Sequence, residues 1–278
     1  MARIGFMQGR LSPLANGKVQ SFPWHTWEVE FEVAARAGFP LIEWTLDAQR
    51  LHENPLLNED GQSRIRKLAT SSHVEVQSLT GDCFMQTPYW KADDVARGRL
   101  LDDLDDILES CVSVGIRFVV MPLVDNGSIQ NSEQRDSLVD GLLSRADRLA
   151  RRKLQIIFES DLAPPHLAKF VAMFPAPTFG INYDIGNSAS LGFDPVVEMR
   201  AYGDRVYNVH VKDRVHRGNT VPLGDGDAQF PTVFSCLARS SYRGDYILQT
   251  ARAQDGDHLG ALLRYRGMVC SWLGTTAG

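Results

Sequence analysis

Four polar residues in the second half of the chain each close a short apolar run: Glu159, Asp184, His210 and Gln249. If these runs are neighbouring parallel strands, their carboxyl ends meet at one edge, so two carboxylates, an imidazole and an amide converge there. Oxygen donors with one nitrogen donor suit Mn²⁺, Mg²⁺ or Co²⁺, and Zn²⁺ also accepts such a set. Burying two carboxylates side by side is costly without a compensating cation. We therefore predict a divalent metal centre formed by these four residues.

Short strands that alternate with helices must position these residues. We predict strands at residues 4–7, 41–44, 74–79, 118–121, 154–158, 180–183, 206–211 and 246–248. Amphipathic segments follow nearly all of them, at 24–37, 62–69, 93–114, 133–151, 165–173, 195–201, 231–238 and 258–272. Nearly continuous apolar strands indicate a parallel sheet buried on both faces. Eight such units in an α/β chain of 278 residues predict a (β/α)8 TIM barrel.

The main alternative fold is an open doubly wound sheet, which usually carries a GxGxxG turn after its first strand. Here that turn reads Met7-Gln8-Gly9-Arg10-Leu11 and lacks the pattern, so the barrel is favoured. No Pro/Gly/Ser-rich linker divides the sequence, and we expect a single domain over residues 1–278.

Composition excludes several classes of partner. The chain has 29 Lys and Arg against 34 Asp and Glu, a net charge of −5, whereas nucleic-acid binders normally present a basic surface. No apolar run approaches the roughly 20 residues that span a bilayer, and no signal segment is evident, so we expect a cytoplasmic protein that binds neither nucleic acid nor membrane. Four scattered cysteines are typical of reduced thiols rather than a disulfide framework.

Six motifs carry a resemblance that spans the whole chain: residues 4–11 (IGFMQGRL), 41–44 (LIEW), 158–160 (FES), 182–187 (NYDIGN), 208–213 (NVHVKD) and 224–227 (GDGD). In their order and spacing the sequence resembles the xylose isomerase-like TIM barrels, in particular the sugar phosphate isomerase/epimerase group. The resemblance implies a metal held by Glu, Asp, His and Glu from the last four strands. Glu159, Asp184 and His210 match the first three positions.

The fourth position departs from the family pattern, because Gln249 stands where a second Glu is expected. The resemblance implies that the two glutamates also act as acid and base on opposite faces of the substrate. A glutamine can ligate through its carbonyl oxygen but cannot exchange a proton as a carboxylate does. We therefore expect weakened metal occupancy, and we favour one-base aldose–ketose isomerisation or β-elimination over two-base epimerisation.

Further residues near the strand ends are candidates for contact with the substrate. With Glu159, we assign catalytic roles to Glu43 and Lys212, although a loop-capping carboxylate and a surface salt bridge are their ordinary alternatives. We assign substrate binding to Gln8, Asn187, Arg214, Arg217 and Arg252; a guanidinium suits a phosphate or carboxylate tail, but solvated loop arginines are common.

The resulting hypothesis is a metal-dependent isomerase or epimerase that moves a proton through an enediolate. Its substrate would be a small sugar, a sugar phosphate or a related ketose or hydroxy-keto acid. The alternatives are a lyase of the same fold, similar to the dehydroshikimate or inosose dehydratases, and a non-catalytic sugar-binding protein with a degraded metal site. A phosphodiesterase of the AP-endonuclease type is weaker, since it needs more histidines and a basic surface. Members of this group are often dimers or tetramers, so a homo-oligomer is expected by analogy.

Overall fold

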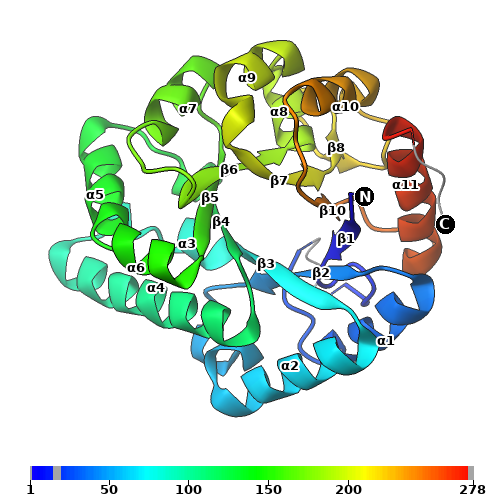
Figure 1. Ribbon diagram of the computed structural model, residues 1–278, viewed down its shortest axis with the longest axis horizontal. Coiled ribbons are helices and arrows are strands. Elements are labelled where there is room, and N and C mark those ends of the chain that lie inside the picture. Colours follow the sequence, from blue (N-terminus) through cyan, green and yellow to red (C-terminus); the bar gives the residue numbers. More distant parts are fainter. Residues whose placement is uncertain (1, 15–19, 275–278) are drawn as a thin grey trace.

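Eight apolar segments form one closed parallel barrel in the computed structural model, which describes residues 2–14 and 20–274 (Figure 1). Its strands are β1 (Ile4–Met7), β2 (Leu41–Leu46), β3 (Glu75–Gly81), β4 (Phe118–Leu123), β5 (Gln155–Ser160), β6 (Phe179–Asp184), β7 (Val206–Val211) and β10 (Tyr246–Leu248). They are paired in the order β1-β10-β7-β6-β5-β4-β3-β2, which closes on itself. The predicted TIM barrel is thus confirmed. Each predicted strand is present, with ends that differ by at most two residues.

Helices surround the ring of strands (Figure 1). They are α1 (Trp27–Ala37), α2 (Glu59–Ser72), α3 (Asp82–Gln86), α4 (Asp94–Val114), α5 (Ser132–Leu143), α6 (Ala146–Arg152), α7 (Pro164–Val171), α8 (Ile185–Leu191), α9 (Pro195–Tyr202), α10 (Phe230–Arg239) and α11 (His258–Trp272). Their apolar faces pack on the outer surface of the strands, which are buried on both sides. This double burial explains why the strands read as continuous apolar runs.

Helix α4 shows how local sequence defines these elements. The Asp93 side chain accepts a hydrogen bond from the backbone N–H of Ala96 at 2.9 Å and caps the first turn. Gly115 ends the helix with φ 90°, a left-handed conformation that favours glycine. Between the caps, a buried stripe that includes Leu104, Leu108 and Cys111 faces the barrel, as its 3.6-residue spacing predicts.

One predicted helix, 133–151, is wrong as a single element, because α5 and α6 are separated at Ser144 and Arg145. The Arg145 side chain turns inward and donates two hydrogen bonds of 2.7 Å to the carboxylate of Asp105 on α4. This bidentate pair fixes the break between the two helices.

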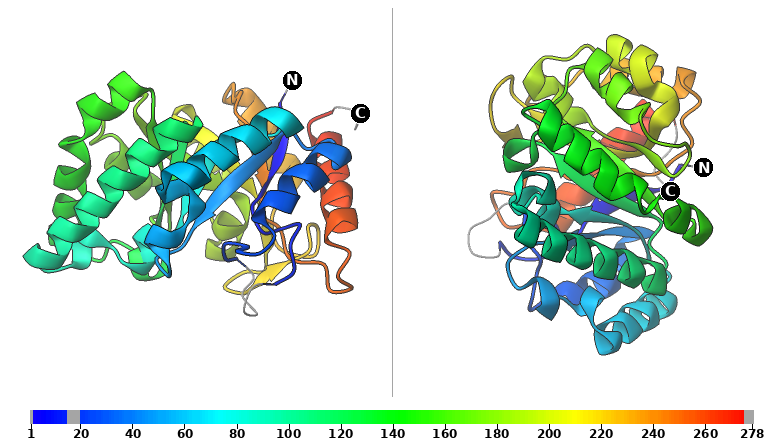
Figure 2. Two further views of the ribbon diagram at one scale, coloured as in Figure 1. Left: turned by 90° about the horizontal axis from the view of Figure 1, so that it is seen from below. Right: turned by 90° about the vertical axis from the view of Figure 1, so that its left-hand side faces the viewer.

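Besides α3, which directly follows β3, two further short features at the strand ends were not predicted, a helix and a hairpin. Helix α8 directly follows β6, and β8 (Asp213–Arg214) pairs with β9 (Thr220–Val221) in a small antiparallel hairpin after β7. Both are too short to show a hydrophobic period. In the side view of Figure 2, the hairpin projects from the end of the barrel opposite to the start of β1.

The strand register brings candidate site residues to this same end. Asp184 on β6 pairs with His210 on β7, and Glu159 on β5 pairs with Pro122 on β4. Among the described residues, no helix is long and apolar enough to span a bilayer.

Candidate functional site

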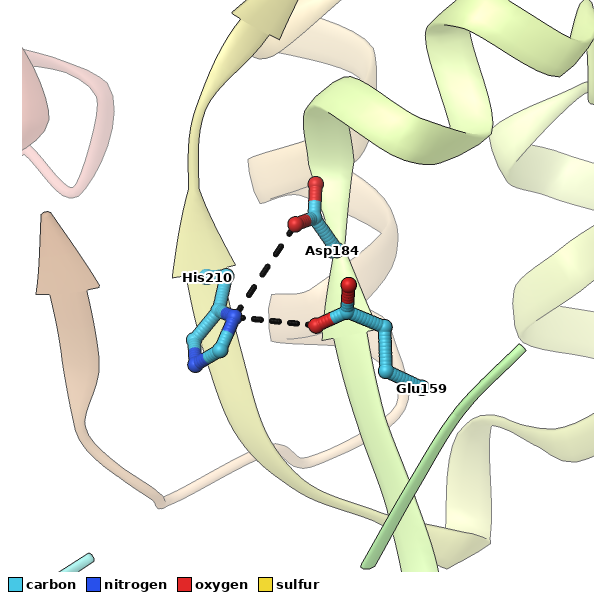
Figure 3. A group of neighbouring side chains, drawn as sticks. All are labelled: Glu159, Asp184 and His210. Carbon is cyan, nitrogen blue, oxygen red and sulfur yellow. Dashed lines mark ion pairs between the residues drawn. The ribbon is translucent and has the colours of Figure 1, made fainter. Parts of the chain in front are cut away.

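His210 lies at the centre of a buried polar cluster at the carboxyl ends of the strands. Its ring is fully buried, and its Nδ1 atom faces Glu159 Oε2 at 3.1 Å and Asp184 Oδ2 at 3.9 Å (Figure 3). These three side chains come from the adjacent strands β5, β6 and β7, and each offers a donor atom within 4.8 Å of the others. Three of the four residues predicted as metal ligands are therefore neighbours in space.

The opposite side of the His210 ring contacts Glu43 on β2. His210 Nε2 is 2.6 Å from Glu43 Oε1, and Thr80 Oγ1 donates to the same oxygen at 2.7 Å. Asn208 Nδ2 donates to Glu43 Oε2 at 3.1 Å. A carboxylate on Nε2 orients the ring and directs Nδ1 toward Glu159 and Asp184.

Glu159 is held by amide donors on both of its oxygens. Asn182 Nδ2 donates to Oε2 at 2.9 Å, and Asn187 Nδ2 donates to Oε1 at 2.7 Å. Asn187 is held in turn by Arg214, whose Nη1 donates to Asn187 Oδ1 at 2.8 Å. The carboxylate is therefore fixed in orientation while remaining at the edge of open space.

Asp184 is both the N-cap of α8 and part of the cluster. Its Oδ1 accepts the backbone N–H of Asn187 at 2.8 Å, which satisfies one of the free N–H groups at the helix start. Its Oδ2 lies 2.7 Å from the ammonium nitrogen of Lys212, a side chain that is only 12% exposed. Lys212 Nζ also donates to Gln249 Oε1 at 3.1 Å.

Gln249 joins this group to the far side of the site through a second glutamine. Gln249 Nε2 donates to Gln20 Oε1 at 2.9 Å, and Gln20 Nε2 donates to Asp82 Oδ2 at 2.7 Å. The carbonyl oxygen predicted to ligate a metal thus accepts a hydrogen bond from Lys212. A continuous hydrogen-bonded chain runs from Lys212 to Asp82.

A cavity of about 440 Å³ opens above these residues, a volume suited to a small sugar. It is lined by Gln20, Thr80, Asp82, Met85, Gln86, Pro122, Val124, Asp125, Glu159, Asp161, Asn187, Ser190, Leu191, Lys212, Arg214 and Gln249. Of the residues predicted from the sequence, Glu159, Lys212, Asn187, Arg214 and Gln249 border this space.

Six other predicted residues are not part of the cavity lining: Asp184 and His210 lie beside Glu159 in the buried cluster, and the remaining four lie away from the cavity. Gln8 and Glu43 are fully buried beneath it, and Gln8 Oε1 accepts the backbone N–H of Thr45. Arg217 is exposed in the turn between β8 and β9, and Arg252 donates to the backbone oxygen of Ser12 at 2.6 Å. The sequence placed Gln8 and Glu43 near strand ends without indicating their depth inside the barrel.

Sequence reasoning assigned no role to several residues that build the site. Asn182 and Asn208 precede Asp184 and His210 by two positions, so each points to the same face of its strand. That period of two could have identified both asparagines. Gln20 contacts Asp82 across 62 positions, and no local sequence signal predicts such a pairing.

The charges in the cluster shift the pKa of its members in opposite directions. Burial lowers the pKa of His210, but Glu43 and Glu159 outweigh burial and raise it to about 10. Burial would raise the pKa of Glu159, yet His210 and Lys212 lower it. For Asp184, burial prevails and raises the pKa despite Lys212. Burial also raises the pKa of Asp82, to about 7.

The cluster offers a donor set that fits a divalent cation. Two carboxylate oxygens and one imidazole nitrogen converge, and the ring is oriented from behind by Glu43, an arrangement typical of metal-binding histidines. An ion there would replace any proton on His210 Nδ1, because histidine binds a metal through an unprotonated ring nitrogen. The residues that could hold it are Glu159, Asp184 and His210.

Comparison with known proteins places this geometry in a family. The sequence model of the family described as "Xylose isomerase-like TIM barrel" matches residues 31–264 of this chain. L-ribulose-5-phosphate 3-epimerase UlaE of Shigella flexneri serotype 5b is 25% identical over 259 residues, which cover 89% of this chain and 88% of that protein.

Solved structures agree on the fold. An IOLI protein with a bound zinc atom superposes with a TM-score of 0.78 at 14% identity, covering 98% of both chains. D-psicose 3-epimerase, solved in the presence of D-fructose, gives a TM-score of 0.77 at 13% identity over 98% of this chain and 99% of that one. At these identities the likeness shows a shared architecture. With the family match across most of its length, the chain belongs to the xylose isomerase-like TIM barrels.

Proposed function

We propose that this protein is an isomerase or epimerase that acts on small ketose sugars by moving a proton next to the substrate carbonyl. The observation that carries the proposal is the placement of Glu159, a buried carboxylate with both oxygens hydrogen-bonded, beside Asp184 and His210 at the edge of the cavity. The relative from Shigella flexneri is a ketose-phosphate epimerase, and D-psicose 3-epimerase shares the fold, which supports this class of substrate.

Glu159 is the group we assign to proton transfer. Its lowered pKa keeps it ionised at neutral pH, so that it can accept a proton, and the amides of Asn182 and Asn187 hold its orientation. Gln249 cannot exchange a proton as a carboxylate does, so Glu159 is without the second glutamate that the family pattern places at position 249. One-base isomerisation between an aldose and a ketose is therefore favoured over two-base epimerisation.

Glu159, Asp184 and His210 are the residues that would hold a divalent ion, with Mn²⁺, Mg²⁺, Co²⁺ and Zn²⁺ as candidates. When bound, the ion would polarise the substrate carbonyl and stabilise developing negative charge. Glu43 orients the His210 ring from beneath the cavity. Arg214 holds Asn187 in place and borders the space that a substrate would fill.

A proton-exchange experiment tests this function whichever sugar is the product. The full chain is incubated with Mn²⁺ in D₂O and a panel of D-fructose, D-psicose, D-tagatose, L-ribulose and L-ribulose 5-phosphate, and NMR follows deuterium entering carbon-bound positions. We expect exchange with at least one ketose, and a rate at least about 10³-fold lower in Glu159→Gln, because a positioned base contributes roughly 10²–10⁴-fold.

Glu133→Gln is the matched control, since Glu133 is exposed at the start of α5. This variant should catalyse deuterium exchange at the wild-type rate. Unchanged exchange in Glu159→Gln would refute the role of that carboxylate. Absence of exchange with every sugar would refute the proposed function. A product lighter by one water would indicate a lyase instead.

A further inference from the structure

The direction of the Lys212 side chain is set by its packing against a glycine. Lys212 follows β7, and its stem lies against Gly186 at the start of α8. A Cβ added to Gly186 would come within 2.7 Å of Lys212 Cγ and 3.0 Å of its Cβ, so only glycine leaves room for this course. The stem is thereby directed toward Asp184, two residues before Gly186, where the ammonium forms its 2.7 Å contact.

Asp184 has a single oxygen left for a cation. Its Oδ1 is committed to the backbone N–H of Asn187, while its Oδ2 faces both Lys212 Nζ at 2.7 Å and His210 Nδ1 at 3.9 Å. Oδ2 is fully buried while the Lys212 side chain lies beside it. A metal bound through Asp184 and His210 would need this same oxygen, which the Lys212 ammonium contacts.

Gln249 supplies the second contact of that ammonium. Its Oε1 accepts from Lys212 at 3.1 Å, and its Nε2 is held by Gln20, which fixes the carbonyl oxygen toward the lysine. The amide orientation therefore makes Gln249 a partner of Lys212. Its oxygen would have to leave that lysine before it could serve as a metal ligand.

We propose that the Lys212 ammonium and the divalent ion compete for Asp184, and that Gln249 strengthens the hold of the lysine. This inference rests on the metal centre in the proposed function and concerns how that centre is loaded. Two positive charges on one buried carboxylate oxygen repel each other strongly, so the ion binds only as the ammonium leaves. Metal loading then releases Lys212 into the cavity it borders, where it can bind a substrate oxygen.

Metal titration tests the competition directly, with no need for a substrate. Mn²⁺ binding to the full chain is measured by isothermal titration calorimetry, with circular dichroism to verify folding. We expect Lys212→Met to lower the Kd at least tenfold. Lys212→Gln is a second variant in case the methionine disturbs packing. Lys169→Met, an exposed lysine on α7, is the matched control and should stay within twofold of wild type.

A double-mutant cycle separates the two roles of Gln249. If Gln249 holds the lysine, Gln249→Ala tightens Mn²⁺ binding in the wild-type background and has no effect beside Lys212→Met. If Gln249 is itself a ligand, Gln249→Ala weakens binding in both backgrounds, and its part in the proposal is wrong. An unchanged Kd in both Lys212 variants would overturn the competition. Failure of every folded variant to bind Mn²⁺ at millimolar concentration would instead refute the metal centre of the proposed function.

Discussion

The His210 ring contacts one glutamate on each side, and the two glutamates differ in their surroundings. On the lower side, Glu43 is fully buried, and His210, Thr80 and Asn208 satisfy its oxygens. On the upper side, Glu159 contacts the same ring but borders the cavity. Both residues are glutamates near the end of an apolar run. Glu43 lies deeper along the barrel axis and positions the ring, whereas Glu159 lies at the level where a substrate would bind.

The strand bounds explain this difference in depth. Glu159 is the penultimate residue of β5, whereas β2 continues three residues beyond Glu43 to Leu46. The predicted strands end at residues 44 and 158, and in the structure both end two residues later, so the offset between Glu43 and Glu159 is already present in the predicted bounds. The strand register places Glu43 in an interior layer, opposite Met7 and Ser78 on the neighbouring strands. Side chains fill such layers in a barrel of this type.

Replacing Glu43 should therefore affect stability more than it affects chemistry. Glu43→Gln removes the charge that faces the buried His210, and breaking a buried pair on one side costs about 3–5 kcal/mol. We expect a loss of about 3 kcal/mol in the free energy of unfolding, measured by urea denaturation at pH 7. Glu43→Gln should keep proton exchange within about tenfold of wild type per folded molecule, whereas Glu159→Gln should not.

Thr80→Val is the matched comparison, since it removes one hydroxyl hydrogen bond to the same carboxylate oxygen but no charge, and it should cost only about 1.5 kcal/mol. A Glu43→Gln loss no larger than that of Thr80→Val would contradict the charge pair. A stable Glu43→Gln protein without any proton exchange would contradict a mainly stabilising role and show that Glu43 is essential to the chemistry.

Features that depend on residues close together in the sequence could be predicted, whereas features that depend on contacts between distant segments could not. The eight strands and most helices could be predicted, because burial on both faces leaves apolar runs and the helices keep a 3.6-residue period. The proximity of Glu159, Asp184 and His210 followed from strand order alone. The depth of Glu43 and the pairing of Gln20 with Asp82 depend on register and loop course, which are set by contacts between distant segments. The contact between Lys212 and Asp184 likewise needs the space that Gly186 leaves.

A third buried carboxylate extends the comparison. Glu30 on α1 is hydrogen-bonded to backbone and hydroxyl groups, whereas Glu43 contacts the His210 imidazole. Glu30 accepts from the backbone N–H groups of Gly9 and Leu11 and from Ser12 Oγ, which fixes the turn after β1. Burial outweighs these donors and raises the pKa of Glu30 to about 7. For Glu43, burial also acts to raise the pKa, but His210 outweighs it and the pKa is lowered. Two equally buried carboxyl groups thus have pKa values shifted in opposite directions, because His210 acts on Glu43.

The raised pKa of Glu30 predicts a stability that falls as pH rises. Between its ordinary pKa of 4.5 and about 7, the unfolded chain has lost the proton that the folded protein keeps. The contribution is complete below the lower value and is lost as pH rises through the higher one, with a slope of at most about 1.4 kcal/mol per pH unit. Urea unfolding across this range should show a shallower slope in Glu30→Gln than in wild type, while Asp82, whose pKa is also raised to about 7, contributes equally to both proteins. Glu32→Gln, an exposed change on the same helix, should retain the wild-type slope, and an equal slope in Glu30→Gln would refute the shift.

The smallest expected effect concerns two arginines that the sequence treated alike. Arg214 borders the cavity and donates to Asn187 Oδ1, which directs the Asn187 amide nitrogen toward Glu159, whereas Arg217 is exposed in the β8–β9 turn. Arg214→Ala frees that amide to turn its oxygen toward the carboxylate, where the two would repel. We expect kcat/KM for the fastest-exchanging ketose to fall about tenfold, equivalent to about 1.4 kcal/mol. Arg217→Ala should change it less than twofold. Equal effects of the two substitutions would mean that contact with Asn187 does not orient Glu159 and that a charge at the cavity mouth is what matters.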